Sequence, residues 1–433
     1  MVSVNWPFSP KRFPFFYGWV VWGFSTLGIL FSIPGQTMGL AVFTDSLIEV
    51  LGLSRTELSL AYLIGTIGSS LFLARAGRWY DALGGRTMIT IASLALSLMI
   101  VYVSFVDVLS NKLGGSVWIS FILILIGYFG VRFFGQGVLT SCSRNVLLLW
   151  FVEKRGLVGG MRNVFVSLGF SIAPLFLASL ISLYGWKESL WILAAVGGIA
   201  FSFLAFVFIR DNPESCGLKA DGLDLESNQE VREEADSKTL QEVKRSPVFW
   251  IYSLSLSMHA LFGTALVFHI ISIFEEVGKG KSEAFSYFIP AAIFSTTSNL
   301  LASWAADKMN LKPILIIMLL FFCLGSLGFI NLQKDWGFWC LALGFGVGGG
   351  LWGVLSNLTF IRFFGPRHLG EISGFSSSLT VFASAIGPAA FSLGYDFFGN
   401  YAAPAKICLG FLIILVFVSV FLDHKEKHLL DIT

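Results

Sequence analysis

Long apolar stretches recur along almost the whole chain and are separated by short polar turns. At about 1.5 Å per residue of helix, each long stretch can cross about 30 Å of hydrocarbon. The stretches are continuously apolar and do not alternate, which favours helices over the strands of a membrane barrel. The pattern predicts an all-α membrane protein with twelve transmembrane helices. The expected spans are 17–43, 57–76, 86–106, 117–149, 158–183, 189–209, 248–273, 284–305, 312–332, 336–360, 372–395 and 403–422.

Composition supports embedding in lipid. Hydrophobic residues make up 55% and charged residues only 13% of the chain, whereas about 25% charged residues is usual for soluble domains. The net charge of +2 is spread in small groups and predicts no nucleic-acid partner. The five cysteines have no paired spacing, so no disulfide framework or metal site is expected. The absence of a phosphate-binding glycine loop or other soluble catalytic motif predicts no cofactor, no catalytic residue and no enzymatic activity.

One charged segment divides the apolar pattern into two sets of six spans. Residues 210–247 hold 10 acidic and 6 basic residues and few large apolar ones, which predicts a solvated linker between halves 1–209 and 248–433. Loops on the side of the N-terminus, with Arg162 counted among them, carry 20 of the 29 Lys and Arg residues. The positive-inside rule then places both termini in the cytoplasm of a multi-pass protein of the cell inner or plasma membrane.

Two turns between spans have the same chemistry, and we call residues 77–86 and 303–312 the twin loops. An acid and a terminal base are equally spaced in both, as Asp81 with Arg86 and Asp307 with Lys312. A carboxylate where a helix emerges can pair with a base five residues further on. A second repeat, offset by 214 residues, matches Gly156 with Gly370, Gly160 with Gly374, Pro174 with Pro388 and Gly185 with Gly399.

The first twin loop resembles the signature between helices 2 and 3 of the major facilitator superfamily. Gly77, Asp81, Gly84 and Arg86 match it, and the second copy keeps Asp307, Lys308 and Lys312 but has Ser303 and Asn310 in place of glycines. The resemblance implies two pseudo-symmetric six-helix halves, alternating access, and a gating role for the twin loops. The alternative is that they are simply charged turns facing the cytoplasm.

A narrower resemblance is to the monocarboxylate and oxalate–formate porter branch. It rests on Tyr17-Gly18-Trp19, Ser54-Arg55, Thr264-Ala265-Leu266-Val267-Phe268-His269, and Arg210-Asp211-Asn212-Pro213-Glu214 with Gly217-Leu218. The branch carries small organic acids, coupled to protons or by exchange, commonly with a base in helix 8 or helix 11. This chain has no base in 284–305 or 372–395.

The fifth span resembles a glycine–proline pattern of antiporters in the superfamily. The residues concerned are Gly160, Gly169, Ala173 and Pro174, with alanine in place of a usual glycine. This pattern favours an exporter of amphipathic compounds as an alternative function. Close packing between helices is the plainer interpretation.

Arg132 is the main candidate for binding an anion. It lies near the middle of a span, where an unpaired charge costs at least about 2.5–3.5 kcal/mol, so it must face protein or water. Its segment Arg132-Phe133-Phe134-Gly135-Gln136-Gly137 resembles the helix 4 motif of the superfamily, with glycine and glutamine exchanged. A structural role, capping carbonyl groups, is the alternative. Arg144 is closer to the end of the same span and can snorkel.

Other candidate substrate ligands are polar residues within the spans. Histidine titrates near physiological pH and can carry a coupling proton; the two candidates in the seventh span are His259 and His269. The Pro34-Gly35 pair predicts a broken helix that exposes backbone groups to a ligand beside Gln36 and Thr37. The remaining candidates are Asn145, Asn299, Trp352 and Asn357.

These features predict a secondary transporter that moves a small solute, favoured to be an organic anion such as a monocarboxylate, by alternating access. The expected partners are the substrate, the lipid bilayer and protons, and a monomer is sufficient. The alternatives are export of amphipathic compounds and a membrane sensor that transports nothing.

Overall fold

The computed structural model describes residues 6–222 and 237–422. Over these residues the chain is helical, without strands, and every one of the twelve predicted spans coincides with helix. Ten spans are helices long and apolar enough to cross a membrane, and α4 with α5, bent by 45°, forms an eleventh. The remaining predicted span, 284–305, corresponds to α17 (Phe288–Ala306). The middle of the predicted linker lies outside the described residues.

Two compact units are found. Unit 1 comprises 1–153, 164–236 and 366–378, and unit 2 comprises 154–163, 237–365 and 379–433. Unit boundaries therefore differ from the halves expected from the linker in two segments. The beginning of α10 (Arg155–Tyr184) belongs to unit 2, and the beginning of α20 (Leu369–Phe398) belongs to unit 1.

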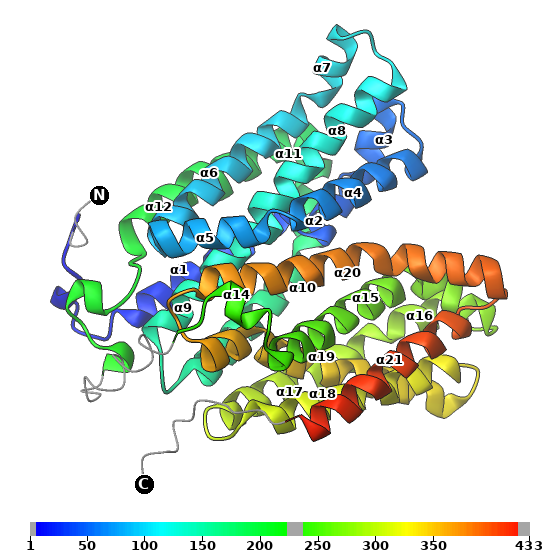
Figure 1. Cartoon of the computed structure of the whole chain (residues 1–433). Coiled ribbons are helices and arrows are strands. Elements are labelled where there is room, and N and C mark those ends of the chain that lie inside the picture. Colours follow the sequence, from blue (N-terminus) through cyan, green and yellow to red (C-terminus); the bar gives the residue numbers. More distant parts are fainter. Residues whose placement is uncertain (1–5, 223–236, 423–433) are drawn as a thin grey trace. The chain divides into compact units, whose positions relative to one another are not determined.

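Unit 1 contains the first six predicted spans except residues 158–163 (Figure 1). Its other helical elements are α1 (Gly18–Phe31), η2 (Ile33–Gly35), α2 (Thr37–Ala41), α3 (Thr44–Leu51), α4 (Arg55–Ser70), α5 (Leu73–Leu83), α6 (Gly85–Ser104), α7 (Val106–Lys112), α8 (Val117–Val131), the π-helical η3 (Arg132–Leu139), α9 (Thr140–Trp150), α11 (Trp186–Leu193), the π-helical η4 (Ala194–Ala200) and α12 (Phe201–Phe208). The central helix α6 packs against α8, α11 and α12.

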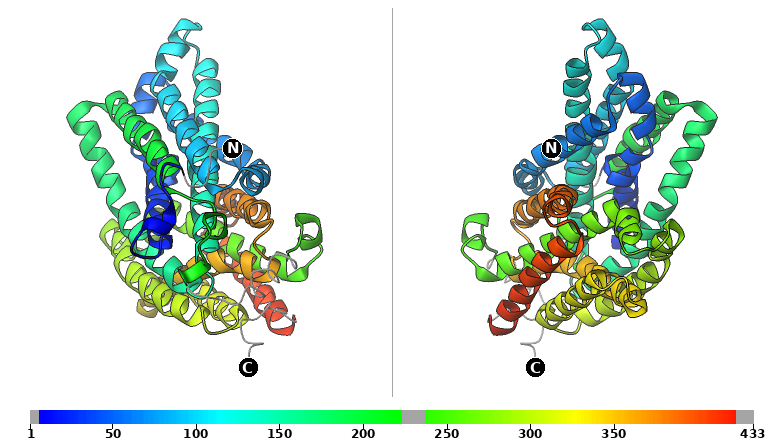
Figure 2. Two further views of the ribbon diagram at one scale, coloured as in Figure 1. Left: turned by 90° about the vertical axis from the view of Figure 1, so that its left-hand side faces the viewer. Right: turned by 90° about the vertical axis from the view of Figure 1, so that its right-hand side faces the viewer.

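Unit 2 contains the last six predicted spans except residues 372–378. Its other helices are α14 (Leu240–Val243), α15 (Pro247–Glu276), α16 (Lys281–Ser286), α17, α18 (Leu311–Ile330), α19 (Asp335–Phe364) and α21 (Ala402–Phe421). Helix α19 packs against α17 and α18, and α21 packs against α18 and α15 (Figure 2).

Local sequence explains several helix boundaries. Ser54 and Glu57 form a capping box at the start of α4, each side chain bonding to the other residue's backbone N–H. Gly84 separates α5 from α6 with φ of 83°, a left-handed conformation that glycine adopts without strain. Ser54 and Gly84 thus set both ends of the bent second span.

The first and fourth spans are both irregular at the same place in unit 1. The first changes from α1 through η2, where Pro34 supplies no N–H, to α2, which confirms the expected break. A Cβ added to Gly35 would lie 2.5 Å from the carbonyl oxygen of Val131 and 2.9 Å from the backbone nitrogen of Gln136. The two irregular segments therefore contact backbone to backbone, which only glycine allows.

Candidate functional site

Arg132 is the first residue of the π-helical segment of the fourth span. It contacts the break in the first span. Its side chain is 2% exposed. Nε donates to Thr66 Oγ1 at 3.2 Å, and Nη1 donates to the carbonyl of Gly35 at 3.0 Å and to Thr37 Oγ1 at 3.4 Å. The ring of Tyr62 lies 5.1 Å from the guanidinium carbon, close enough for a cation–π contact. The guanidinium is therefore fixed in orientation by α4 and the broken first span.

The remaining donors of Arg132 are the two N–H groups of Nη2. Neither makes a hydrogen bond, and no carboxylate forms an ion pair with this guanidinium, among the residues that the structure describes. Thr37 is exposed and Tyr62 half-buried, and their hydroxyl oxygens are 2.8 Å apart. A permanent cation with unused donors next to two hydroxyl groups is suited to an anion.

Gln36 is close to this group but points into packed protein. It is 8% exposed, and its Nε2 donates to Ser32 Oγ at 3.0 Å and Thr140 Oγ1 at 3.2 Å. Its amide thus links the first span to the fourth next to the helix break. Of the predicted residues in this region, Arg132 and Thr37 share direct contacts and Gln36 adjoins them.

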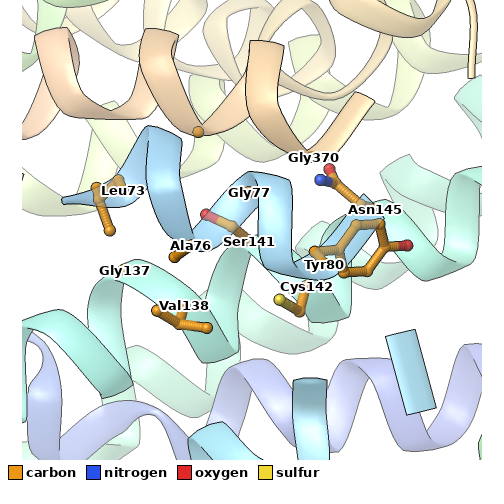
Figure 3. Close-up of a pocket in the computed structure, with 11 residues that line it drawn as sticks. Leu73, Ala76, Gly77, Tyr80, Gly137, Val138, Ser141, Cys142, Asn145 and Gly370 are labelled. Atoms are coloured by element: carbon orange, nitrogen blue, oxygen red, sulfur yellow. The ribbon is translucent and has the colours of Figure 1, made fainter. Parts of the chain in front are cut away.

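Asn145 lies elsewhere in unit 1, beside the first twin loop. Its Nδ2 donates to Ser373 Oγ at 2.9 Å, and Arg144 Nη2 donates to Ser377 Oγ at 3.2 Å. Asn145, Tyr80 and Cys142 line a small cavity, together with Gly77 and Gly370 (Figure 3). The cavity volume of about 10 Å³ is close to the minimum for one water molecule, so it is too small for a transported solute.

Two candidate ligands of unit 2, His259 and Trp352, belong to one cluster of aromatic rings. The ring of His259 stacks on Phe322 with centroids 4.7 Å apart and lies 5.4 Å from Trp352. Trp352 Nε1 donates to the carbonyl of Leu256 at 3.1 Å, whereas His259 Nδ1 is buried and has no hydrogen bond within the described residues. His259 therefore retains an unused polar atom, and Trp352 does not.

Asn299 and Asn357 belong to a buried amide group next to α19. Asn299 Nδ2 donates to the carbonyl of Gly350 at 2.9 Å, and Asn357 Nδ2 donates to that of Gly353 at 2.8 Å. Arg162, which is 1% exposed, donates from Nη2 to Asn357 Oδ1 at 2.7 Å. Arg162 was counted among the loop bases, and the structure places it inside α10. Its position within the predicted span 158–183 was the available signal.

The acid of the first twin loop caps a helix that is distant in sequence. Asp81 Oδ1 accepts from the N–H of Gly370 at 2.8 Å, and Oδ2 accepts from that of Glu371 at 2.9 Å. These are among the first N–H groups of α20, which have no partner inside the helix. A carboxylate also interacts favourably with the positive end of the helix dipole.

Asp307 makes the equivalent cap in unit 2. Its two oxygens accept from the N–H groups of Gly156 at 2.6 Å and Leu157 at 2.8 Å, at the start of α10. Arg362 lies 3.7 Å from its Oδ1. The offsets of 226 residues between the acids and 214 between the capped glycines therefore describe one arrangement formed twice.

Glycines allow this close approach. A Cβ on Gly77 would clash with the carbonyl group of Gly370, and a Cβ on Gly370 would lie only 2.6 Å from Asp81 Oδ1. In unit 2, Ser303 replaces the first glycine, and Gly160 leaves space for it, since a Cβ there would lie 2.5 Å from Ser303 Oγ. The second loop thus packs its serine against a glycine on α10.

A sequence model of the Major Facilitator Superfamily matches residues 24–388. The chain belongs to the major facilitator superfamily. It is therefore an integral multi-pass membrane protein with the fold of secondary transporters, in which twelve helices form two pseudo-symmetric halves. Transporters of this superfamily bind small molecules within the membrane and are generally not enzymes. No curated protein sequence matches the chain.

Solved structures of superfamily members agree with this assignment. The proton:xylose symporter XylE bound to 6-bromo-6-deoxy-D-glucose is 18% identical, with 95% of this chain and 96% of that chain covered and a TM-score of 0.73. A bacterial homologue of the iron transporter ferroportin is 17% identical, with coverage of 92% and 98% and a TM-score of 0.71. The human organic anion transporter MFSD10 is 16% identical, with coverage of 93% and 99% and a TM-score of 0.60. At such identities the likeness shows the fold alone.

The bases of the superfamily-like twin loops do not pair with the acids five residues before them. Arg86 donates from Nε to the carbonyl of Phe206 at 2.6 Å and from Nη2 to that of Trp6 at 2.9 Å. Lys312 Nζ donates to the carbonyls of Val420 at 3.0 Å and Leu422 at 2.9 Å. The expected intraloop pairing was therefore wrong. Each base instead caps the end of the last helix of its unit, where carbonyl groups lack partners.

The other predicted gating residues of the transporter have local roles. Gly84 faces Asp211, since an added Cβ would lie 2.6 Å from its carboxylate, and this carboxylate accepts from the N–H of Arg86 at 2.8 Å. Lys308 Nζ lies 4.1 Å from the ring centroid of Trp304, on the same turn of chain. These contacts of Gly84 and Lys308 therefore do not involve the helix that is capped by the acid of the same loop, which is α20 for Asp81 and α10 for Asp307.

The helix 5 pattern of the transporter lies along α10. Gly169 faces Leu30 of α1, because an added Cβ would clash with its Cδ2 atom. Ala173 is 5% exposed, and Pro174 lies inside the continuous helix α10. Within unit 1 these residues support close packing of α10 on α1, which agrees with the plainer interpretation of the pattern.

The base contacts lead to a stability prediction. Arg86→Gln removes charged hydrogen bonds to two backbone carbonyl groups, each worth about 1.5–3 kcal/mol, so we expect a lower unfolding temperature by scanning fluorimetry in detergent. The matched control is Arg78→Gln, whose guanidinium is 56% exposed and pairs with Glu371, a surface pair worth about 0–1 kcal/mol. Equal unfolding temperatures for the two variants would contradict an anchoring role for Arg86.

Proposed function

We propose that this transporter moves a small organic anion of the monocarboxylate class by alternating access. The observation that carries the proposal is Arg132, a buried guanidinium with two unused N–H donors and no carboxylate partner among the described residues. A carboxylate can accept one hydrogen bond from an Nη2 N–H and a second from the Thr37 hydroxyl. A single cation matches a single carboxylate, which favours monocarboxylates over dicarboxylates.

Two further observations support the class of substrate. The chain resembles the monocarboxylate and oxalate–formate porter branch in several ordered motifs, including Tyr17-Gly18-Trp19 and the string that ends at His269. The Tyr62 and Thr37 hydroxyl groups next to Arg132 can orient a carboxylate through neutral hydrogen bonds. Because this branch commonly uses a base in helix 8 or 11, and none is present here, we assign the anion to Arg132 in helix 4.

We further propose that the Asp81 and Asp307 caps form the cytoplasmic gate, with both termini in the cytoplasm. Helix α20 begins in unit 1 and continues in unit 2, and α10 does the reverse, so each cap holds the start of a helix that extends into the other unit. A side-chain cap contributes about 1 kcal/mol. Two such caps can be released during a transport cycle, since a shift from 1:99 to 99:1 requires about 5.5 kcal/mol. A gradient of protons or of substrate would supply the energy.

A thermal-shift screen tests the substrate class. The panel contains formate, acetate, lactate, pyruvate and oxalate, with xylose and a bulky amphipathic cation as other classes. We expect monocarboxylates to raise the unfolding temperature of the wild type and not that of Arg132→Gln. The matched control Arg55→Gln removes a guanidinium whose side chain is 71% exposed and should respond like the wild type. Stabilisation by the amphipathic cation alone would favour the exporter hypothesis instead.

A further inference from the structure

The porter-like string of α15 faces α20 within unit 2. Thr264 Oγ1 lies 2.8 Å from Ser384 Oγ, and His269 Nε2 lies 2.9 Å from the carbonyl oxygen of Pro388. A Cβ added to Gly387 would clash with the carbonyl of Leu261, so the two helices approach backbone to backbone between these contacts. Both polar residues at the ends of the string therefore serve one helix interface.

The Pro388 contact determines which nitrogen of His269 carries hydrogen. A backbone carbonyl can only accept, so Nε2 must donate. In the neutral imidazole, Nδ1 then has the free lone pair, and it is the atom that can bind a further proton.

Tyr401, at the start of α21, faces that nitrogen. Its hydroxyl oxygen lies 3.5 Å from His269 Nδ1, at the long end of hydrogen-bond distances, and the two ring centroids are 5.3 Å apart. Burial raises the pKa of Tyr401, so its hydroxyl keeps its proton at neutral pH and can donate to Nδ1. Once Nδ1 is protonated, both groups would be donors, and the hydroxyl must rotate to accept.

The titratable groups that interact with Tyr401 are acidic or phenolic. Glu276 of α15 accepts from the backbone N–H of Tyr401 at 3.0 Å, and Tyr395 and Asp396 of α20 interact with Tyr401 electrostatically. In the described part of the chain, α16, α18 and α19 contribute no hydrogen bond or ion pair to His269 or Tyr401. No carboxylate forms an ion pair with the imidazole within the described residues.

We propose that His269 is a proton-binding site that couples transport to protons, with the proton taken up at Nδ1. The proton comes from water and returns to water, and no covalent bond other than N–H is made or broken. The imidazolium form donates a charge-assisted hydrogen bond to Pro388, which strengthens the contact of α15 with α20. Coupling to transport rests on the proposed function, whereas proton binding does not.

Histidine NMR tests proton binding without any substrate. The wild type is labelled with ¹⁵N-histidine in lipid nanodiscs and titrated from pH 8 to pH 5, and His269→Gln assigns its signals among the five histidines. We expect the Nε2–H tautomer at pH 8 and protonation of Nδ1 within this range. Tyr401→Phe should shift the Nδ1 resonance of the neutral form more than that of Nε2. The Nδ1–H tautomer, or an imidazole that stays neutral to pH 5, would overturn the proposal.

A flux measurement tests coupling. Proteoliposomes are given the best-stabilising acid of the panel, and accumulation is compared with and without a more acidic exterior. We expect the gradient to raise accumulation severalfold in the wild type and in the control His368→Gln, and to have no effect in His269→Gln. A retained gradient response in His269→Gln would refute coupling through this residue. If no acid is transported, the proposed function fails, while the NMR titration still decides whether His269 binds a proton.

Discussion

Arg132→Gln is expected to weaken saturable anion uptake into proteoliposomes strongly. The substitution removes the charge and the two Nη2 donors, and a hydrogen bond to a charged group contributes about 1.5–3 kcal/mol. Since about 1.4 kcal/mol is a factor of ten in affinity, the dissociation constant should rise by about 10–150-fold. Radiolabelled uptake as a function of anion concentration measures this change.

Arg132→Lys separates charge from geometry. Lysine keeps the positive charge, but it cannot donate to Thr66 and Gly35 and still present a planar pair of donors to a carboxylate. We expect intermediate uptake, above that of Arg132→Gln and well below the wild type. Full activity in the lysine variant would mean that only the charge matters.

A loss of activity in the Arg132 variants has one structural explanation that must be tested separately. Arg132 also holds the carbonyl of Gly35 at the break in the first span, so its removal can disturb the fold. Thr37→Val keeps the shape of an exposed side chain and removes only its hydroxyl. Weaker anion binding in this variant, at an unchanged unfolding temperature, would assign the effect to the ligand site. If both Thr37→Val and Arg132→Gln bind the anion as the wild type does, the proposed anion site at these residues is refuted.

Asp81→Asn is expected to open the cavity that contains Cys142. Asparagine retains one acceptor oxygen but turns an N–H donor toward the second backbone N–H, so the cap of α20 loses both a hydrogen bond and the charge. The loss of a cap costs about 0.5–2 kcal/mol, which corresponds to a several-fold larger open population. Cys142 is 3% exposed and lies beside Gly370 and Gly374, so release of this end of α20 should expose its thiol.

The measurement is the rate of maleimide labelling of Cys142, with the other four cysteines replaced by alanine. We expect labelling about fivefold faster in Asp81→Asn than in the wild type. Asp307→Asn, whose cap is in unit 2 and lines no part of this cavity, is measured in parallel. Asp45→Asn, which removes an 85% exposed carboxylate, is the matched control. Identical labelling rates in the cap variants and the control would rule out a gating role for the caps.

The two kinds of residue in the twin loops were not equally predictable. Repetition of acid and base along the chain indicated two equivalent structures, and the equivalence is visible in the matching caps of Asp81 and Asp307. The partners could not be inferred, because Gly370 is 289 residues from Asp81 in the chain. For Arg86, proximity in sequence suggested Asp81 as a partner, but the helix start directs its side chain toward the end of α12.

The residues of the candidate anion site were also unequally predictable from the sequence. Arg132 could be identified from the sequence because placing a charged side chain within an apolar span costs free energy, so a functional or structural role is expected for it. Tyr62 and Thr66, which complete its surroundings, are ordinary residues of an amphipathic span and carry no signal of their own. Conversely, Gln36 met the criteria for a ligand, yet its amide is occupied by Ser32 and Thr140.

The amino-acid sequence by itself determined the membrane environment, the twelve helices and their duplication. These follow from local properties, since a run of apolar residues must bury its backbone polar groups in a helix wherever it enters lipid. The tertiary structure alone decided which backbone groups the loop acids cap, which donors of Arg132 stay unused, and which nitrogen of His269 contacts a backbone carbonyl. Each depends on the positions of atoms far apart in the chain, and hydrogen bonding is directional over about 3 Å.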